Sequence, residues 1–170
     1  MKKILILFIV LFGISGCTGA KLKISKRPIK LDKEIQTIAM MPSGGIIADS
    51  IGIELLNYGF DIVDTATTTS MMTRINMTEI EYSKPQNLRQ LNSEGIDSIM
   101  LVKSVVGYDN RPNNISVRII LTSNGKLIVG ATWQNARAGV RGSMADGVSR
   151  LVLTEAAISI AEGLANELKL

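Results

Sequence analysis

ISVRIILTSNGKLIVGATWQ, residues 115–134, is the stretch that decides the fold. From Ile115 to Leu121, apolar residues occupy every second position, which is the pattern of a strand with one buried face. Asn124 and Gly125 then form a pair that favours a tight turn, and a second apolar run follows it. The stretch therefore predicts an antiparallel hairpin late in the chain.

The C-terminal segment predicts a long helix against that hairpin. Ser143 is placed to cap a helix that begins near Met144. From Leu153 to Leu168, apolar residues recur three and four positions apart and form one continuous stripe. We expect Ile160 and Leu164, which belong to this stripe, to face the sheet.

The earlier part of the domain alternates short apolar runs with helical patterns. Strands are predicted at 35–42, 60–64 and 96–109, and helices at 46–58, after Asp64 and after Pro85. Together with the hairpin and the C-terminal helix, this order predicts one compact α/β (α+β) domain. Its sheet is mixed, with parallel pairing early and an antiparallel hairpin late, and helices pack on it.

The N-terminal stretch MKKILILFIVLFGISGC predicts export. Two lysines precede an apolar run that is too short to span a bilayer and has the length of a signal-peptide core. Ile14-Ser15-Gly16-Cys17 resembles the lipobox of bacterial lipoproteins. That resemblance implies cleavage before Cys17 and acylation of Cys17. Thr18 stands where an inner-membrane retention signal usually carries Asp, so we expect an outer-membrane, lipid-anchored, periplasm-facing protein in a Gram-negative host. A plain secretory signal with an incidental cysteine is the alternative.

Charge divides the rest of the chain. We expect residues 1–16 to be a signal peptide, 17–34 a lipidated cysteine with a basic tether, and 35–170 the periplasmic domain. Residues 18–34 hold six basic and two acidic residues, a net charge of +4, whereas residues 35–170 have a net charge of −2. The tether either lies on anionic headgroups or peptidoglycan or is a solvated spacer. Nucleic-acid binding is disfavoured, because the folded part is slightly acidic.

The composition argues against several kinds of catalysis. The chain has no histidine and one cysteine, which excludes Cys-His nucleophiles, Ser-His-Asp triads and the usual zinc sites. Ser123 and Lys126 match the Ser-x-x-Lys spacing of penicillin-recognising enzymes, in which the serine begins a helix. Here the two residues bracket the predicted Asn-Gly turn instead. We therefore expect no enzymatic activity, no cofactor and no metal. A carboxylate-based wall hydrolase and a small-ligand-binding module are the rival interpretations.

One loop is a candidate partner-binding surface. Trp133, Arg137 and Arg141 fall in or beside a glycine-bearing stretch, and aromatic and arginine side chains are enriched in protein interfaces. The alternative is a buried tryptophan followed by a solvated loop.

Several phrases of the domain suggest a family. IAMMP (38–42), LLNYGFDIVD (55–64), GIDSIMLV (95–102) and ILTSNGKLIVGATW (120–133) resemble phrases of the superfamily that includes the curli-secretion lipoprotein CsgG, LpoB, FlgO and the amino-terminal domain of TolB. The resemblance implies a structural or assembly component of an envelope machine of secretion or flagellar type. Such a component works by protein-protein binding and can form a homo-oligomeric ring. The alternative that it implies is an LpoB-like activator of a peptidoglycan synthase.

Overall fold

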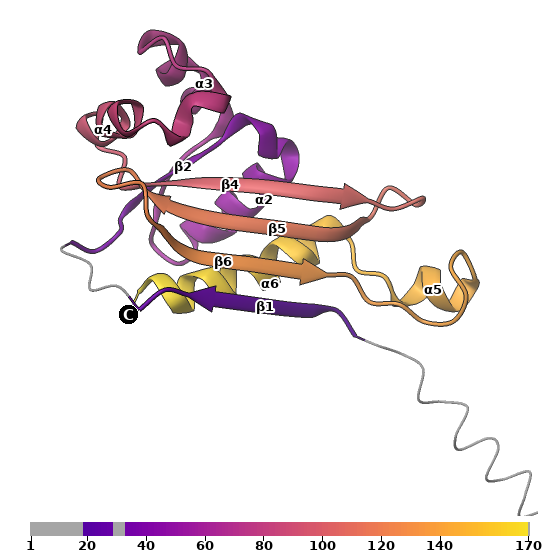
Figure 1. The fold of residues 1–170 in the computed structure, drawn as a ribbon. Coiled ribbons are helices and arrows are strands. Elements are labelled where there is room, and N and C mark those ends of the chain that lie inside the picture. Colours follow the sequence, from indigo (N-terminus) through magenta and orange to yellow (C-terminus); the bar gives the residue numbers. More distant parts are fainter. Residues whose placement is uncertain (1–18, 29–32, 170) are drawn as a thin grey trace, which may run out of the picture.

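A six-stranded sheet with helices on both faces forms the body of the protein (Figure 1). The computed structural model describes residues 19–28 and 33–169. In chain order, the elements are β1 (Lys21–Lys26), β2 (Thr37–Met40), η1 (Pro42–Gly44), α2 (Gly45–Leu56), β3 (Asp61–Val63), α3 (Thr65–Arg74), η2 (Glu79–Ser83), α4 (Pro85–Ser93), β4 (Ser98–Val106), β5 (Pro112–Leu121), β6 (Leu127–Gln134), α5 (Met144–Ser149) and α6 (Leu153–Leu168).

The sheet has the mixed topology that the sequence predicts. Its strand order is β1-β6-β5-β4-β2-β3. The early strands β2, β3 and β4 pair in parallel, whereas β4, β5 and β6 form an antiparallel meander. Parallel pairing needs a crossover, and α2 supplies it between β2 and β3. The predicted α+β architecture is therefore confirmed.

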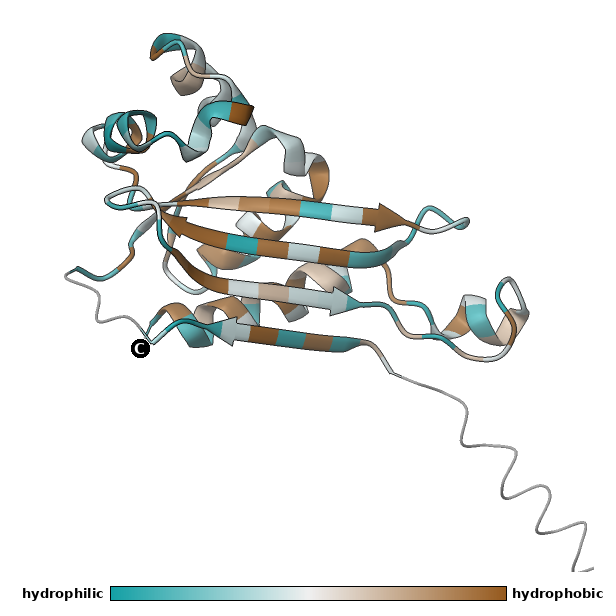
Figure 2. Ribbon diagram, in the orientation of Figure 1, coloured by the Kyte–Doolittle hydropathy of each residue, from teal (hydrophilic) through white to brown (hydrophobic). Residues whose placement is uncertain are grey.

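The main hydrophobic core lies between α2, α6 and one face of the sheet. The alternating apolar residues of β5 point into it, as the period-two pattern predicts. Ile160 and Leu164 of α6 are fully buried there, while Glu162 is exposed on the other side of the helix. Figure 2 shows the alternation of hydrophobic and hydrophilic residues along the strands. The predicted orientation of α6 is confirmed.

The opposite face of the sheet is covered at one end. Helices α3 and α4 pack a second apolar cluster against β2 and β4, in which Met72, Leu88 and Leu91 meet Ile99 and Leu101. No helix of the described residues covers the same face of β5, β6 and β1 (Figure 1). Polar side chains line that half of the sheet.

Strand β1 changes the predicted domain boundary. We expected a tether up to residue 34, but Lys21–Lys26 pair antiparallel with β6 and form an edge of the sheet. Leu22 and Ile24 pack on the main core, and Lys21 and Lys23 are exposed on the polar face. The tether prediction is therefore wrong for this strand. An edge strand with one solvated face accommodates lysines at alternate positions.

The predicted C-terminal helix is interrupted. Ser143 caps a helix as expected, with its hydroxyl accepting a hydrogen bond from the Asp146 amide. That helix, α5, ends at Ser149, and Arg150 is extended. The Leu151 amide donates a hydrogen bond of 2.8 Å to the side chain of Asn135, the residue after β6. This contact stabilises the non-helical link between α5 and α6. The segment from 144 to 168 is two helices rather than one.

The β5–β6 hairpin turns through a longer loop than the Asn-Gly pair predicts. Five residues, 122–126, separate the two strands. Within the loop only Gly125 has a positive φ, of 72°, whereas a two-residue type I′ turn needs a positive φ at both central positions. The Asn124 side chain instead accepts a hydrogen bond from the Lys126 amide.

Candidate functional site

The structure separates the residues of the predicted binding loop. Trp133 lies on β6 and is 1% exposed in the main core. Arg137 and Arg141 are exposed in the connection between β6 and α5. Trp133 therefore stabilises the fold and is not available to a partner. Cys17, the predicted lipidation site, lies outside the described residues.

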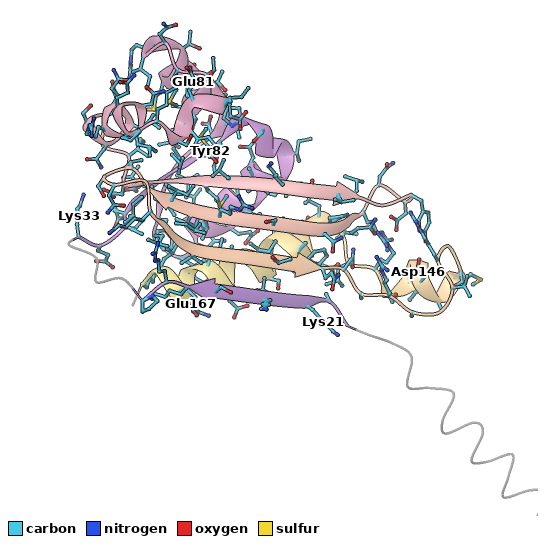
Figure 3. All side chains as sticks on the ribbon, in the orientation of Figure 1. Lys21, Lys33, Glu81, Tyr82, Asp146 and Glu167 are labelled. Atoms are coloured by element: carbon cyan, nitrogen blue, oxygen red, sulfur yellow. The ribbon has the colours of Figure 1, made fainter. Side chains whose placement is uncertain are left out.

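Arg137 and Arg141 belong to a projecting part of the molecule, which we call the α5 end. It consists of residues 135–150 together with the β4–β5 turn, residues 107–111. Figure 1 shows it at the end of the sheet where β1 begins. Asp146 of α5 and Lys21 of β1 are labelled at this same end in Figure 3.

Tyr108 joins the turn to α5. Its hydroxyl donates a hydrogen bond to Oδ2 of Asp146 at 2.9 Å, and the Gly142 amide donates to the same oxygen at 3.1 Å. These two donors lower the pKa of Asp146, the Gly142 amide contributing most. The same hydrogen bond raises the pKa of Tyr108. Asp146 is therefore ionised at neutral pH and holds the loop before α5 against the turn.

A second set of contacts comes from Arg150 and Arg111. The Arg150 side chain is 3% exposed, and its Nε donates to Asp109 Oδ2 at 2.8 Å. The Arg111 guanidinium donates to the backbone oxygens of Gly147 and Arg150 at 2.6 and 2.7 Å. A buried ion pair with further hydrogen bonds is costly to break, because removal of one partner leaves a buried charge. Charged groups thus hold residues 147–150 against the β4–β5 turn within the α5 end.

Arginine side chains surround a hollow of about 180 Å³ in the α5 end. The guanidinium groups of Arg141 and Arg150 each lie 5.6 Å from the centre of the Tyr108 ring, within cation-π range. A smaller hollow of about 130 Å³ adjoins it, and Lys21, Arg137 and Gly19 are among its lining residues. Cationic groups therefore continue from the α5 end to the start of β1.

The sequence predicts the two exposed arginines of the α5 end but not the side chains that hold its two segments together. Tyr108, Asp109 and Arg111 fall in the turn GYDNRPNN, which predicts only a polar loop. Tyr108 meets Asp146, which lies 38 residues away, and Asp109 meets Arg150, which lies 41 residues away. No local spacing relates such pairs.

A second candidate surface lies on the polar face of the sheet. We call it the η2 groove, a cavity of about 270 Å³ lined by Ser43, Glu79, Ile80, Tyr82, Leu101, Lys103, Ser116 and Arg118. Figure 3 shows Tyr82 and Glu81 of η2 above β4. In the sheet register, Lys103 lies opposite Ser116, and Leu101 lies opposite Arg118. The groove thus combines an apolar floor with two cationic side chains.

The carboxylate in the η2 groove is already engaged. Glu79 accepts a hydrogen bond from the Ser43 amide at 3.0 Å, which ties η2 to the turn before α2. Over residues 19–28 and 33–169, no three His, Cys, Asp or Glu side chains gather as a metal site. In the same ranges, none of the helices has the length and apolar character needed to cross a membrane.

Comparison with known proteins gives a likeness of fold. No protein-family model and no curated protein sequence matches the chain. A PelC dodecamer from Paraburkholderia phytofirmans is 13% identical, with a TM-score of 0.49 over 88% of this chain and 99% of the PelC chain. Lipoprotein GNA1162 from Neisseria meningitidis is 17% identical, with a TM-score of 0.50 over 78% of this chain and 98% of that one. The chain therefore shares the fold of the Neisseria lipoprotein.

Proposed function

We propose that the protein is a lipid-anchored component of a bacterial envelope assembly that acts by binding a protein partner. The Ile14-Ser15-Gly16-Cys17 motif supports the anchor, and the fold shared with lipoprotein GNA1162 is consistent with it. Thr18 after the cysteine favours the outer membrane, with the domain in the periplasm. Binding rather than turnover accords with a chain without histidine, whose one cysteine is the acylated residue in this proposal.

The observation that carries the binding role is the η2 groove. Helices cover the β2 end of this face, and the groove opens where that cover stops, beside the polar half of the sheet. Leu101 provides a buried apolar floor, and Ile80 is 90% exposed at the rim. An exposed isoleucine beside an apolar floor gives a partner side chain a place to be buried.

The charges of the groove indicate the kind of partner. Two exposed cationic side chains on adjacent strands, Lys103 and Arg118, outnumber the carboxylate of Glu79 among the lining residues. We therefore infer a partner segment that carries acidic residues beside an apolar anchor. Complementary charge of this kind sets specificity and the rate of association.

The experiment is recovery of the partner from cross-linked membranes with the tagged full-length protein. Lys103→Glu with Arg118→Glu reverses both cationic charges of the groove, and we expect loss of the partner. Arg89→Glu with Lys126→Glu makes the same change of charge at exposed positions of α4 and the β5–β6 loop, and should leave recovery unchanged. Circular dichroism checks that both variants are folded.

Two results would contradict the proposal. Equal recovery by the two double variants would remove the groove as the interface, and peptidoglycan cleavage by the purified protein would replace binding by catalysis. The anchor is tested separately by incorporation of labelled palmitate, which Cys17→Ala should abolish.

A further inference from the structure

The α5 end exposes apolar side chains that the fold does not use. Val140, Met144 and Val148 are 79%, 89% and 87% exposed. Met144 and Val148 are four residues apart within α5, so they lie on the same side of the helix. Asp146, by contrast, is buried against the turn. The carboxylate of Asp146 therefore points inward, whereas the side chains of Val140, Met144 and Val148 point outward.

Cationic side chains flank these apolar groups. Arg141 follows Val140 directly in the chain, and Arg137 precedes it by three residues. Lys21 and Arg137 line one hollow, and Arg137 and Arg141 line the next. Apolar side chains beside a set of lysine and arginine residues form the pattern of a segment that lies in the interface of a bilayer with anionic lipids.

The path of the chain places this end close to the proposed anchor. Lys21 pairs with Gln134, the last residue of β6, just before the connection to α5. The described chain extends to Gly19, which lines the same hollow as Arg137. Gly19 follows Cys17 by two positions, and two residues of extended chain span at most about 7 Å. The described chain therefore begins two positions after the proposed acylation site, beside Arg137 of the α5 end.

We propose that the α5 end docks on the surface of the phospholipid bilayer. Val140, Met144 and Val148 enter the interface, and Lys21, Arg137 and Arg141 contact lipid phosphates. This inference rests on the proposed lipid anchor and deepens it. It also assigns Arg137 and Arg141 to the membrane, which leaves the η2 groove as the protein-binding surface.

The test uses the full-length protein, lipidated in cells and reconstituted into vesicles of phosphatidylethanolamine and phosphatidylglycerol. Met144→Cys and Val148→Cys each introduce one thiol for a polarity-sensitive dye, because acylation consumes Cys17. Ile53→Cys is the matched control, at a position on α2 that is 62% exposed. We expect dye emission at shorter wavelength, and quenching by lipid-attached quenchers, at positions 144 and 148 but not at 53.

A charge test accompanies it. Arg137→Glu with Arg141→Glu, introduced beside Met144→Cys, should reverse the emission shift, since the carboxylates are repelled by phosphatidylglycerol. The same loss is expected in high salt if the arginines act through lipid charge.

The other outcomes overturn the inference. An unshifted dye at position 144 on protein that floats with the vesicles would show that the α5 end stays in water. A shifted dye that lipid quenchers do not reach would show that a second copy of the chain covers the patch. If Cys17 were not acylated, the result would be distinguishable from these two. The wild-type protein would then react with the thiol dye at Cys17 and would not float with the vesicles.

Discussion

The hydroxyl of Tyr108 donates a hydrogen bond of 2.9 Å to the carboxylate of Asp146 and so joins the β4–β5 turn to α5. The same carboxylate accepts from the Gly142 amide, and the Asp146 amide donates to the Ser143 hydroxyl. Asp146 thus fixes the start of α5 and its distance from the β4–β5 turn.

Loss of the Tyr108 hydroxyl should loosen α5 without unfolding the domain. Tyr108→Phe keeps the ring beside Arg141 and Arg150 but removes the donor to Asp146. We expect faster amide hydrogen exchange over residues 142–149 and unchanged exchange in β5 and β6. Tyr58→Phe, which alters a half-buried tyrosine after α2, is the control. Equal exchange in α5 for both variants would mean that the Tyr108 contact does not hold the helix.

Acid should release the same contact. The Gly142 amide and the Tyr108 hydroxyl lower the pKa of Asp146 in the folded protein below its unfolded value of about 3.9. A depressed pKa means that the ionised carboxylate stabilises the folded form. This contribution is complete above about pH 4 and is lost as the pH falls through the folded pKa. The Gly142 amide resonance should therefore titrate below pH 3.9, and Asp146→Asn should abolish that titration.

Gly163 should be needed for the contact between α6 and β1. A Cβ atom at this position would lie 2.4 Å from the Ile24 side chain and 2.7 Å from that of Leu22. Gly163→Val should lower the free energy of unfolding by about 1–3 kcal/mol, because the added atoms crowd the terminal methyl groups of Ile24 and Leu22 and force them to repack. Gly147→Ala, where nothing lies within 4 Å of the added Cβ, should be neutral or slightly stabilising. Urea unfolding measures both, and an unaltered Gly163→Val protein would show that β1 is not packed as described.

Trp133 should matter for stability. Trp133→Ala removes a side chain buried at 1% exposure and should lower the free energy of unfolding by about 3–5 kcal/mol. Thr132→Ala, at an exposed neighbouring position of β6, should change it by less than about 0.5 kcal/mol. Unfolding is followed by circular dichroism, because Trp133→Ala removes the one tryptophan whose fluorescence would otherwise report it. A stable Trp133→Ala protein that has lost its partner would instead restore Trp133 as a binding residue.

Patterns of neighbouring residues in the sequence predict those helices and strands that are determined by residues close together in the chain. The apolar stripe of α6, the alternation in β5 and Pro85 at the start of α4 appear as expected, and Asp64 caps the helix predicted after it. Each of these features arises from residues within a few positions of one another. They were enough to predict the class of fold and the mixed sheet, while membership in the CsgG-like superfamily stays a prediction.

The α5 end could not be predicted in this way, because non-local contacts build it. Arg150 interrupts the predicted long helix by turning towards Asp109, and Asn135 holds the break by accepting from the Leu151 amide. Strand β1 is a different case, since Leu22 and Ile24 do alternate with lysines in the sequence. Its positive charge led to the prediction of a tether, although one face of an edge strand tolerates that charge.

The position of β1 has a mechanical consequence. The strand pairs with β6 along its whole length, from Lys21 to Lys26, and Gly19 and Ala20 precede it in the described chain. A pull on residue 20 along the strand axis would load these hydrogen bonds in parallel, in shear, instead of opening them one after another. Forced detachment of β1 would also have to draw Leu22 and Ile24 out of the core beneath α6. The first strand is therefore built to transmit tension from the N-terminal side into the whole domain.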